Sequence, residues 1–166
     1  EGQFDWQGFR AHLDRELDRL EGAYTSGLVG ANVEIHRDRA TLIDAHTVQL
    51  AGGARFTARH ILIAVGGRPA RPAIPGAELG IVSDDIFNLP ELPGKVVIVG
   101  SSFIACEFAG ILNGLGAQVV QICRGDQVLR GFDEEMRLRA TQQLRAGGID
   151  LRLSTSPERL EREGDG

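Results

Sequence analysis

The second half of the chain alternates strand-like and helix-like segments, and this order restricts the fold more than any other feature. Residues 96–99 are consecutive apolar residues, as expected for a strand buried on both faces, and residues 119–122 indicate a second strand. An almost wholly apolar helix is expected at 103–114, and a helix with an acidic first turn at 133–147. Alternation at 149–153 indicates a third strand. The order predicts an α/β fold: a Rossmann-like domain with a parallel sheet.

The segment between the first predicted strand and its helix resembles a dinucleotide-binding turn. Gly100 to Ala105 occupy the place of the G-x-G-x-x-G/A fingerprint, directly after a strand and at the start of a helix. Gly100 allows a tight turn, Ala105 allows close helix packing, and the helix N-terminus offers N–H groups to a pyrophosphate. Ser102 replaces the second glycine, so the motif alone leaves an ordinary structural βα turn equally open.

Two arginines follow the second predicted strand. Arg124 lies 24 positions after Gly100, where an NAD site usually has an acidic residue for the ribose hydroxyl, and Arg130 lies six residues further on. Planar guanidinium groups match a 2′-phosphate better than a neutral ribose. The spacing therefore favours NADP over NAD, and the alternative is a pair of solvated loop arginines.

Three other polar or reactive residues have simpler interpretations. Glu107 is the only charged residue between the lysine at 95 and Arg124, so it is either a buried, paired carboxylate or the solvent-facing position of its helix. Cys106 and Cys123 stand in apolar surroundings and are expected to be core residues rather than nucleophiles. The four histidines have no ligand-like spacing, so no metal site is proposed.

The first part of the chain predicts a helix followed by short strands. Asp5 is the expected N-cap of the helix, and Gly27 or Gly30 its end, with a coiled-coil arm as the alternative interpretation. A strand at 61–65 is expected to be buried on both faces. The apolar face of the helix comprises Phe9, Leu13, Leu17, Leu20, Tyr24 and Leu28. Half-buried strands are expected at Val33 and Ile35, at Ala40 and Leu42, at Val48 and Leu50, and at Phe56 after a turn at 51–53.

Proline content divides the chain. Five of the six prolines fall between residues 69 and 93, and a single helical turn is expected at 84–88. At 166 residues the chain is long enough for one domain or two small ones. We therefore expect a first domain at 1–75, a connection at 76–94 and a second domain at 95–166.

The charge and hydropathy of the chain exclude some partners. Lys and Arg total 18 against 23 Asp and Glu, a net charge of −5, which argues against broad binding to nucleic acid or to membrane surfaces. No apolar run approaches the roughly 18 residues of a membrane span. The chain opens with Glu1 and its only methionine is Met136, so we expect a processed chain or a fragment.

Several segments resemble the glutathione reductases, in order and with matching spacing over nearly the whole chain. They are FDW at 4–6, HILIAVGGRP at 60–69, LPGK at 92–95, FIACEFAGI at 103–111 and VLRGFD at 128–133. The resemblance implies a cytoplasmic, homodimeric flavoprotein that passes electrons from NADPH through FAD to a redox disulfide, and then to glutathione disulfide.

The resemblance also implies that this chain is a middle portion of such an enzyme. Residues 1–75 are similar to the closing part of an FAD-binding domain, a helix plus a β-meander, and the remainder to most of an NADPH-binding domain. The FAD fingerprint, the CxxxxC redox pair and the C-terminal interface domain with its His-Glu pair have no counterpart here. We therefore assign no catalytic residue to this chain, and the chain alone is not expected to be catalytic.

Site residues follow by matching positions. Phe103 stands where the family usually has a tyrosine that covers the nicotinamide pocket, and Val65 replaces a usual threonine. Asp38 and Arg39 depart from the Gly-His that usually precedes the FAD-contacting alanine. The NADPH-binding set is Gly100, Ser101, Ser102, Phe103, Ile104, Ala105, Glu107, Arg124 and Arg130, and the FAD-binding set is Ala40, Gly66 and Gly67.

Three alternatives remain open or are disfavoured. Trypanothione reductase shares the Leu-Arg-Gly-Phe-Asp segment but usually carries an insertion near 113–117 that is absent here. Dihydrolipoamide dehydrogenase uses NADH and requires an acidic residue at Arg124. A degenerate, non-catalytic nucleotide-binding module is supported by Ser102 and by the missing redox cysteines.

Overall fold

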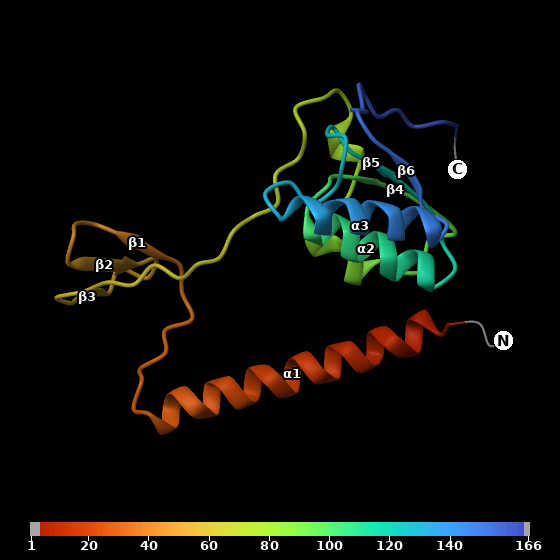
Figure 1. The fold of residues 1–166 in the computed structure, drawn as a ribbon. Coiled ribbons are helices and arrows are strands. Elements are labelled where there is room, and N and C mark those ends of the chain that lie inside the picture. The colour runs from red at the N-terminus through yellow and green to blue at the C-terminus, as the bar shows by residue number, and fades with distance from the viewer. Residues whose placement is uncertain (1–3, 165–166) are drawn as a thin grey trace. The chain divides into compact units, whose positions relative to one another are not determined.

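The structure is a computed structural model that describes residues 4–164. The chain divides into two compact units (Figure 1). We call the residues up to Arg10, together with those from Pro69 onward, the α/β unit, and Ala11–Arg68 the meander unit. Helix α1 (Trp6–Gly30) begins in the first and continues into the second. The predicted domain boundaries at 75 and 94 stay a prediction.

The α/β unit is built on a three-stranded parallel sheet. Strands β4 (Lys95–Val99), β5 (Gln118–Ile122) and β6 (Asp150–Arg152) pair in that order. Helices α2 (Phe103–Gly114) and α3 (Glu134–Ala146) connect them and lie side by side (Figure 1). Because each connection joins parallel neighbours through a helix, the unit is a βαβαβ fold, and the predicted fold class is confirmed. The strand expected at 96–99 is present, but its expected burial on both faces is wrong, because Val97 is 53% and Val99 48% exposed on the face that no described element covers.

Local sequence signals set the ends of both helices. The Asp133 carboxylate accepts hydrogen bonds from the N–H groups of Glu135 at 3.0 Å and Met136 at 3.2 Å, and so caps the start of α3. Gly116 follows α2 and Gly148 follows α3, and both have a positive φ, of 98° and 94°. Such left-handed residues end helices because glycine has no Cβ to oppose them.

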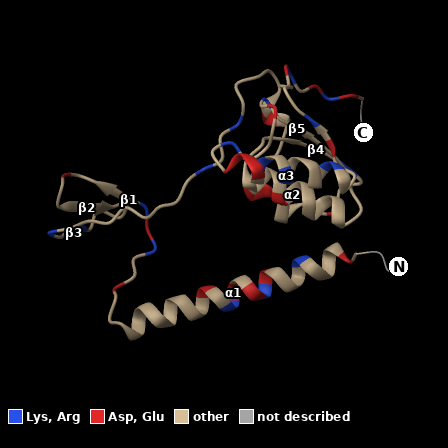
Figure 2. Cartoon of the chain, in the orientation of Figure 1, with Lys and Arg blue, Asp and Glu red and all other residues tan. Residues whose placement is uncertain are grey.

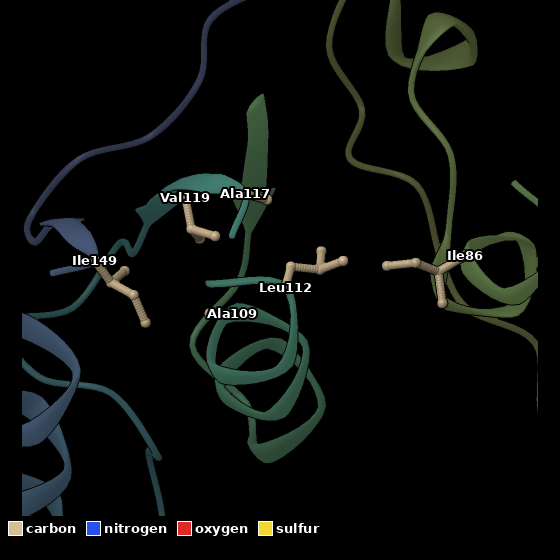
Figure 3. Packing of buried hydrophobic residues seen from close by; sticks show 6 residues of the cluster. All are labelled: Ile86, Ala109, Leu112, Ala117, Val119 and Ile149. Atoms are coloured by element: carbon tan, nitrogen blue, oxygen red, sulfur yellow. The ribbon is translucent and has the colours of Figure 1, made fainter. Parts of the chain in front are cut away.

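One hydrophobic cluster joins α2, the sheet and the connection before it. Leu112 of α2 points toward Ile86 in Figure 3. Ile86 belongs to the 3-10 helix Ser83–Asn88, which confirms the helical turn expected at 84–88. The cluster comprises Ile86, Ala109, Leu112, Ala117, Val119 and Ile149. A second cluster, of Cys123, Val128 and Leu151, lies under α3. A further 3-10 turn, Ala77–Leu79, lies within the connection.

The first turn of α1 is fixed to the α/β unit. The indole N–H of Trp6 donates to the Leu89 carbonyl at 2.9 Å, and the Arg10 guanidinium donates to the same carbonyl at 3.2 Å. The Asp5 carboxylate accepts from the N–H of Gly8 at 2.9 Å. The predicted N-cap of this helix is therefore confirmed. The helix ends at Gly30, which is one of the two ends that the sequence predicts.

The meander unit contains the rest of α1 and a three-stranded antiparallel sheet. Strands β1 (Ala40–Leu42), β2 (Thr47–Leu50) and β3 (Arg55–Thr57) pair as a meander, which confirms that strands form there. The expected half-burial is found only in β2, because every residue of β1 and β3 is exposed. Charges of both signs lie along the middle of α1 (Figure 2). Glu21 on this helix accepts from Arg37 at 2.8 Å.

Two strands expected in the meander unit are wrong. Val33 and Ile35 form no strand, and neither do residues 61–65, whose Leu62 is 89% exposed. The predicted apolar face of α1 is largely uncovered: Leu13 and Leu20 are partly buried, whereas Leu17 is 54% and Tyr24 72% exposed. A strand needs neighbours for its N–H and C=O groups, and an apolar face needs a surface to cover it. The described residues supply neither to these segments.

Candidate functional site

A tight turn joins β4 to α2. Gly100 has a φ of +150°, and a Cβ built on it would lie 3.3 Å from the Cβ of Ala105 in the first turn of α2. The N–H of Gly100 donates to the Ile122 carbonyl at the end of β5, at 3.0 Å. A bare glycine followed by a small alanine thus lets the helix start directly against the sheet.

The start of α2 presents unused hydrogen-bond donors. Ser102 is the N-cap, with φ −73° and ψ 171°, a conformation open to any residue, and its hydroxyl makes no capping hydrogen bond. Within the described part of the chain, no acceptor takes the N–H groups of residues 101–105. These groups carry the positive end of the helix dipole, so the turn can bind an anion.

The loop that carries the two arginines is anchored to this turn. The N–H of Leu129 donates to the Ser101 carbonyl at 2.6 Å. The preceding Val128 is fully buried, its N–H lies 3.4 Å from the Thr141 hydroxyl, and its carbonyl accepts from Arg137 at 3.1 Å. The loop is therefore held on both sides of Val128 by α3 and the glycine turn.

Arg124 and Arg130 are exposed and have no ion-pair partner among residues 4–164. Two of the carboxylates near them in sequence contact other groups. Asp126 lies 3.9 Å from Arg137, and Asp133 caps α3. Two guanidinium groups without a carboxylate partner leave a net positive charge beside the turn, which favours an anionic ligand.

The turn between β4 and α2 lines one open pocket of about 550 Å³ together with Arg124 and Arg130, and we call it the Gly100 pocket. No acidic residue lines it. Its lining residues are Pro72, Ile74, Val99, Gly100, Ser101, Ser102, Ile122, Arg124, Arg130, Thr155, Ser156 and Pro157. The structure thus brings five of the predicted NADPH-binding residues together: Gly100, Ser101, Ser102, Arg124 and Arg130.

The sequence interpretation missed the far wall of this pocket. Residues 155–157 follow β6, and Pro72 and Ile74 lie between β3 and β4, just before the connection predicted at 76–94. A signal for the first group was present, because the carboxyl ends of neighbouring parallel strands meet at one edge of a sheet. The second group has no such signal in the sequence.

The other predicted NADPH-binding residues lie on α2 outside the pocket lining. Phe103 and Ile104 are exposed in its first turn, and Ala105 is buried beneath Gly100. Glu107 is exposed, so its solvent-facing interpretation is correct and the buried, paired alternative is wrong.

The predicted FAD-binding residues belong to the meander unit. Ala40 begins β1, and Gly66 has a φ of +67°; these two residues and Gly67 are exposed. A separate shallow pocket in this unit, lined by His46, Thr57, Ala58 and Arg59, contains none of them.

Cys123 is a core residue as predicted, whereas Cys106 is only partly buried and packs against the edge of the same cluster. Cys123 is 1% exposed, and burial raises the pKa of its thiol to about 11. Burial also raises the pKa of the Cys106 thiol, with a smaller opposing effect from a hydrogen bond with Gln121. Both thiols stay protonated near neutral pH, which is the opposite of an activated nucleophile.

The donors of the Gly100 pocket fit a dinucleotide with an additional phosphate. Free N–H groups at a helix N-terminus suit a pyrophosphate, and the arginine pair suits a second, separate phosphate. Pro72, Ile74 and Pro157 provide apolar lining for the remainder of such a ligand. None of the helices in residues 4–164 combines the length and apolar character needed to span a membrane.

Known proteins resemble the chain along most of its length. It is 49% identical over 158 residues to a glutathione reductase of Burkholderia cepacia, covering 95% of the chain and 35% of that protein. It is 47% identical to a glutathione reductase of Nostoc, covering 90% and 32%. A chloroplastic/mitochondrial glutathione reductase of Pisum sativum is 43% identical, covering 100% and 30%. The chain spans about a third of the length of these relatives.

Solved structures share the fold. The Cu(II) complex of the HOCl-induced flavoprotein disulfide reductase RclA of Escherichia coli superposes with a TM-score of 0.87 at 23% identity, over 98% of this chain and 38% of that one. The same reductase described without copper gives 0.82, over 95% and 37%. Residues 4–166 match the family described as pyridine nucleotide-disulphide oxidoreductase. The chain therefore belongs to the pyridine nucleotide-disulphide oxidoreductase family.

Proposed function

We propose that the Gly100 pocket binds NADPH and that the complete protein is an FAD-dependent NADPH:glutathione-disulfide oxidoreductase. One observation carries the proposal: unused N–H donors at the start of α2 and two unpaired arginines line the same pocket. A nucleotide with a pyrophosphate and a separate 2′-phosphate needs both sets of donors.

Each group has a role in this proposal. The N–H groups of residues 101–105 receive the pyrophosphate, and Arg124 and Arg130 receive the 2′-phosphate. Phe103, exposed in the first turn of α2, covers the nicotinamide, and Ile104 and Glu107 make further contacts. Bound NADPH supplies a hydride for FAD, and FAD is held in part by Ala40, Gly66 and Gly67. The chain's own residues bind and orient these groups, and the redox disulfide lies elsewhere in the complete protein.

The substrate and assembly are also proposals. Relatives named glutathione reductases at 43–49% identity support glutathione disulfide as the substrate. We further propose that the complete protein is a cytoplasmic homodimer that contributes to redox homeostasis and binds neither nucleic acid nor membranes. Within it, residues 1–75 form part of the FAD domain and 95–166 part of the NADPH domain, joined by 76–94.

The arginine pair provides the test. In the complete protein, the double variant Arg124→Ala, Arg130→Ala should lose at least about tenfold in NADPH affinity, because each charge-assisted contact contributes about 1.5–3 kcal/mol. NADH has no 2′-phosphate, so its affinity should change little. Arg139→Ala is the matched control, since Arg139 is exposed on α3 and does not line the pocket. Equilibrium fluorescence titrations with both coenzymes measure the difference.

Two results would contradict the proposal. An equal loss for both coenzymes would show that the arginines support the loop without binding the 2′-phosphate. If neither the parent nor the arginine variant binds either coenzyme measurably, the second candidate is favoured, a degenerate, non-catalytic module, which rests on Ser102 in place of the usual glycine. Reconstructing that glycine with Ser102→Gly would then restore coenzyme binding if the serine side chain is what excludes the phosphate.

A further inference from the structure

The carbonyl of Gly100 is held by two side chains, one from the neighbouring strand β5 and one from the residue directly after it. The amide Nε2 of Gln121 donates to it at 3.0 Å, and the Sγ–H of Cys123 donates to it at 3.3 Å. The N–H of Gly100 is bonded to the Ile122 carbonyl between them, at 3.0 Å. Three consecutive residues, 121–123, therefore bind both backbone polar groups of Gly100, and its carbonyl, which belongs to the Gly100–Ser101 peptide, is held by two of them.

Gln121 is an unusual residue for its place. It is the one polar residue in the run Val119-Val120-Gln121-Ile122-Cys123, it is 0% exposed, and its Oε1 has no hydrogen-bond partner within residues 4–164. A buried amide with an unsatisfied oxygen stabilises a core less than a leucine of similar volume would. The core does not explain the glutamine, whereas its bond to the Gly100 carbonyl gives it a role in the turn.

Cys123 can act as the second donor under ordinary conditions. Burial keeps the pKa of its thiol at about 11, so the S–H proton is present throughout the neutral range. Cys123 and Gln121 are two residues apart on a strand, so their side chains leave the same face of the sheet. That common direction lets both reach one carbonyl.

Fixing this carbonyl also fixes the next N–H. A trans peptide is planar, with its C=O and N–H directed to opposite sides, and the chain has no cis peptide among its described residues. The Gly100 carbonyl is directed to the buried Gln121 and Cys123, so the Ser101 N–H is directed away from them. Ser101 lines the Gly100 pocket and its N–H has no partner within the described chain.

We propose that Gln121 and Cys123 are positioning residues, which hold the Gly100–Ser101 peptide so that the Ser101 N–H is presented to the coenzyme pyrophosphate. This inference rests on the proposed coenzyme site. The pyrophosphate is common to NADPH and NADH, whereas the 2′-phosphate is not. Loss of positioning therefore lowers affinity for both coenzymes by the same factor, unlike loss of Arg124 and Arg130.

The experiment uses the complete protein and titrates both coenzymes. Gln121→Leu and Cys123→Ala should each weaken NADPH and NADH equally, by about threefold to tenfold, the range expected for one hydrogen bond. Cys123→Ser keeps a donor and should retain most of the affinity. Val119→Ala is the matched control, because Val119 is a buried residue on the same face of β5 but distant in register from the turn. It should lower the unfolding temperature and leave both affinities unchanged.

The outcomes distinguish failure of this inference from failure of the proposed coenzyme site. If the arginine variant loses NADPH selectively while Gln121→Leu and Cys123→Ala bind both coenzymes normally, the positioning role is wrong and the coenzyme site stands. If Val119→Ala weakens binding as much as they do, general destabilisation explains the loss and the positioning role is again wrong. If the arginine variant binds NADPH normally, and Gln121→Leu and Cys123→Ala do so as well, both proposals fail. Should Gln121→Leu not fold, a difference between Cys123→Ala and Cys123→Ser supports the role, and equal affinities overturn it.

Discussion

The two units bury very different amounts of apolar surface. Every buried apolar side chain among residues 4–164 belongs to the α/β unit, although the meander unit has a long helix and a paired sheet of its own. In the α/β unit each helix returns across its own parallel strands, so local connections close a core. In the meander unit the backbone hydrogen bonds are made without a second layer. A sequence can therefore form regular helices and strands without forming a hydrophobic core.

The largest expected effect tests this contrast in burial. Leu112→Ala should lower the free energy of unfolding by about 2–5 kcal/mol, because Leu112 is buried at the centre of its cluster and its loss leaves a cavity. Leu17→Ala on the exposed face of α1 should change it by less than about 0.5 kcal/mol. Urea unfolding of the chain, followed by far-UV circular dichroism and by Trp6 fluorescence, measures both.

Trp6 makes the comparison specific. It is the only tryptophan, it is buried in the α/β unit, and its indole N–H is bonded to Leu89. Its fluorescence therefore reports the unfolding of that unit. Similar losses for the two leucine variants would contradict the contrast in burial between the units.

The second prediction compares one turn from each unit. Gly100 and Gly53 both have a positive φ, of 150° and 90°, but a Cβ on Gly100 would meet Ala105 whereas one on Gly53 would meet nothing within 4 Å. Gly53→Ala should cost about 1 kcal/mol from backbone strain, and Gly100→Ala should cost more, up to about 3 kcal/mol. Thermal unfolding measures the difference.

The matched control for both is a glycine without strain. Gly110 lies within α2, has no positive φ, and has open space where a Cβ would be. Gly110→Ala should therefore stabilise the chain by about 0.5–1 kcal/mol. An equal loss for Gly53→Ala and Gly100→Ala would show that contact with Ala105 adds nothing to the strain.

Prediction from the sequence succeeded more often in the α/β unit than in the meander unit. The helix at 103–114 was predicted with the bounds that the structure has, because its strands and caps are close in sequence. The strand expected at 61–65 was wrong, although its residues are as apolar as those of β4. An apolar pattern indicates which side chains favour burial. It does not indicate whether the same chain provides a surface against which they can pack.

The candidate site could be predicted in part for a related reason. Gly100, Arg124 and Arg130 occupy places that the βαβ geometry defines, so spacing alone indicated them. Gln121 could not be found in this way, because its role depends on one carbonyl of another segment. A lone amide in an apolar strand is a weak signal, but it was visible in the sequence. Residues 72 and 74 line the pocket only because of the path that the chain takes between β3 and β4.

The smallest expected effect is a pH dependence that belongs to the α/β unit, which contains both cysteines. Burial raises the pKa of Cys123 from 9.0 to about 11. Between these values the unfolded chain loses the thiol proton while the folded chain keeps it, so stability is complete below pH 9 and falls as the pH rises toward 11. At pH 10 the loss should be about 1 kcal/mol.

Cys123→Ser isolates this thiol from every other group that titrates in alkaline solution. A serine hydroxyl does not ionise in this range, so the variant should lose less stability than the parent between pH 8 and about 10, by roughly that 1 kcal/mol. Urea unfolding followed by Trp6 fluorescence, whose reporter lies in the same unit, measures both curves. Parallel curves would mean that the thiol ionises as easily in the folded chain as in the unfolded one. Cys123 would then be accessible to water, and its bond to the Gly100 carbonyl would not persist in solution.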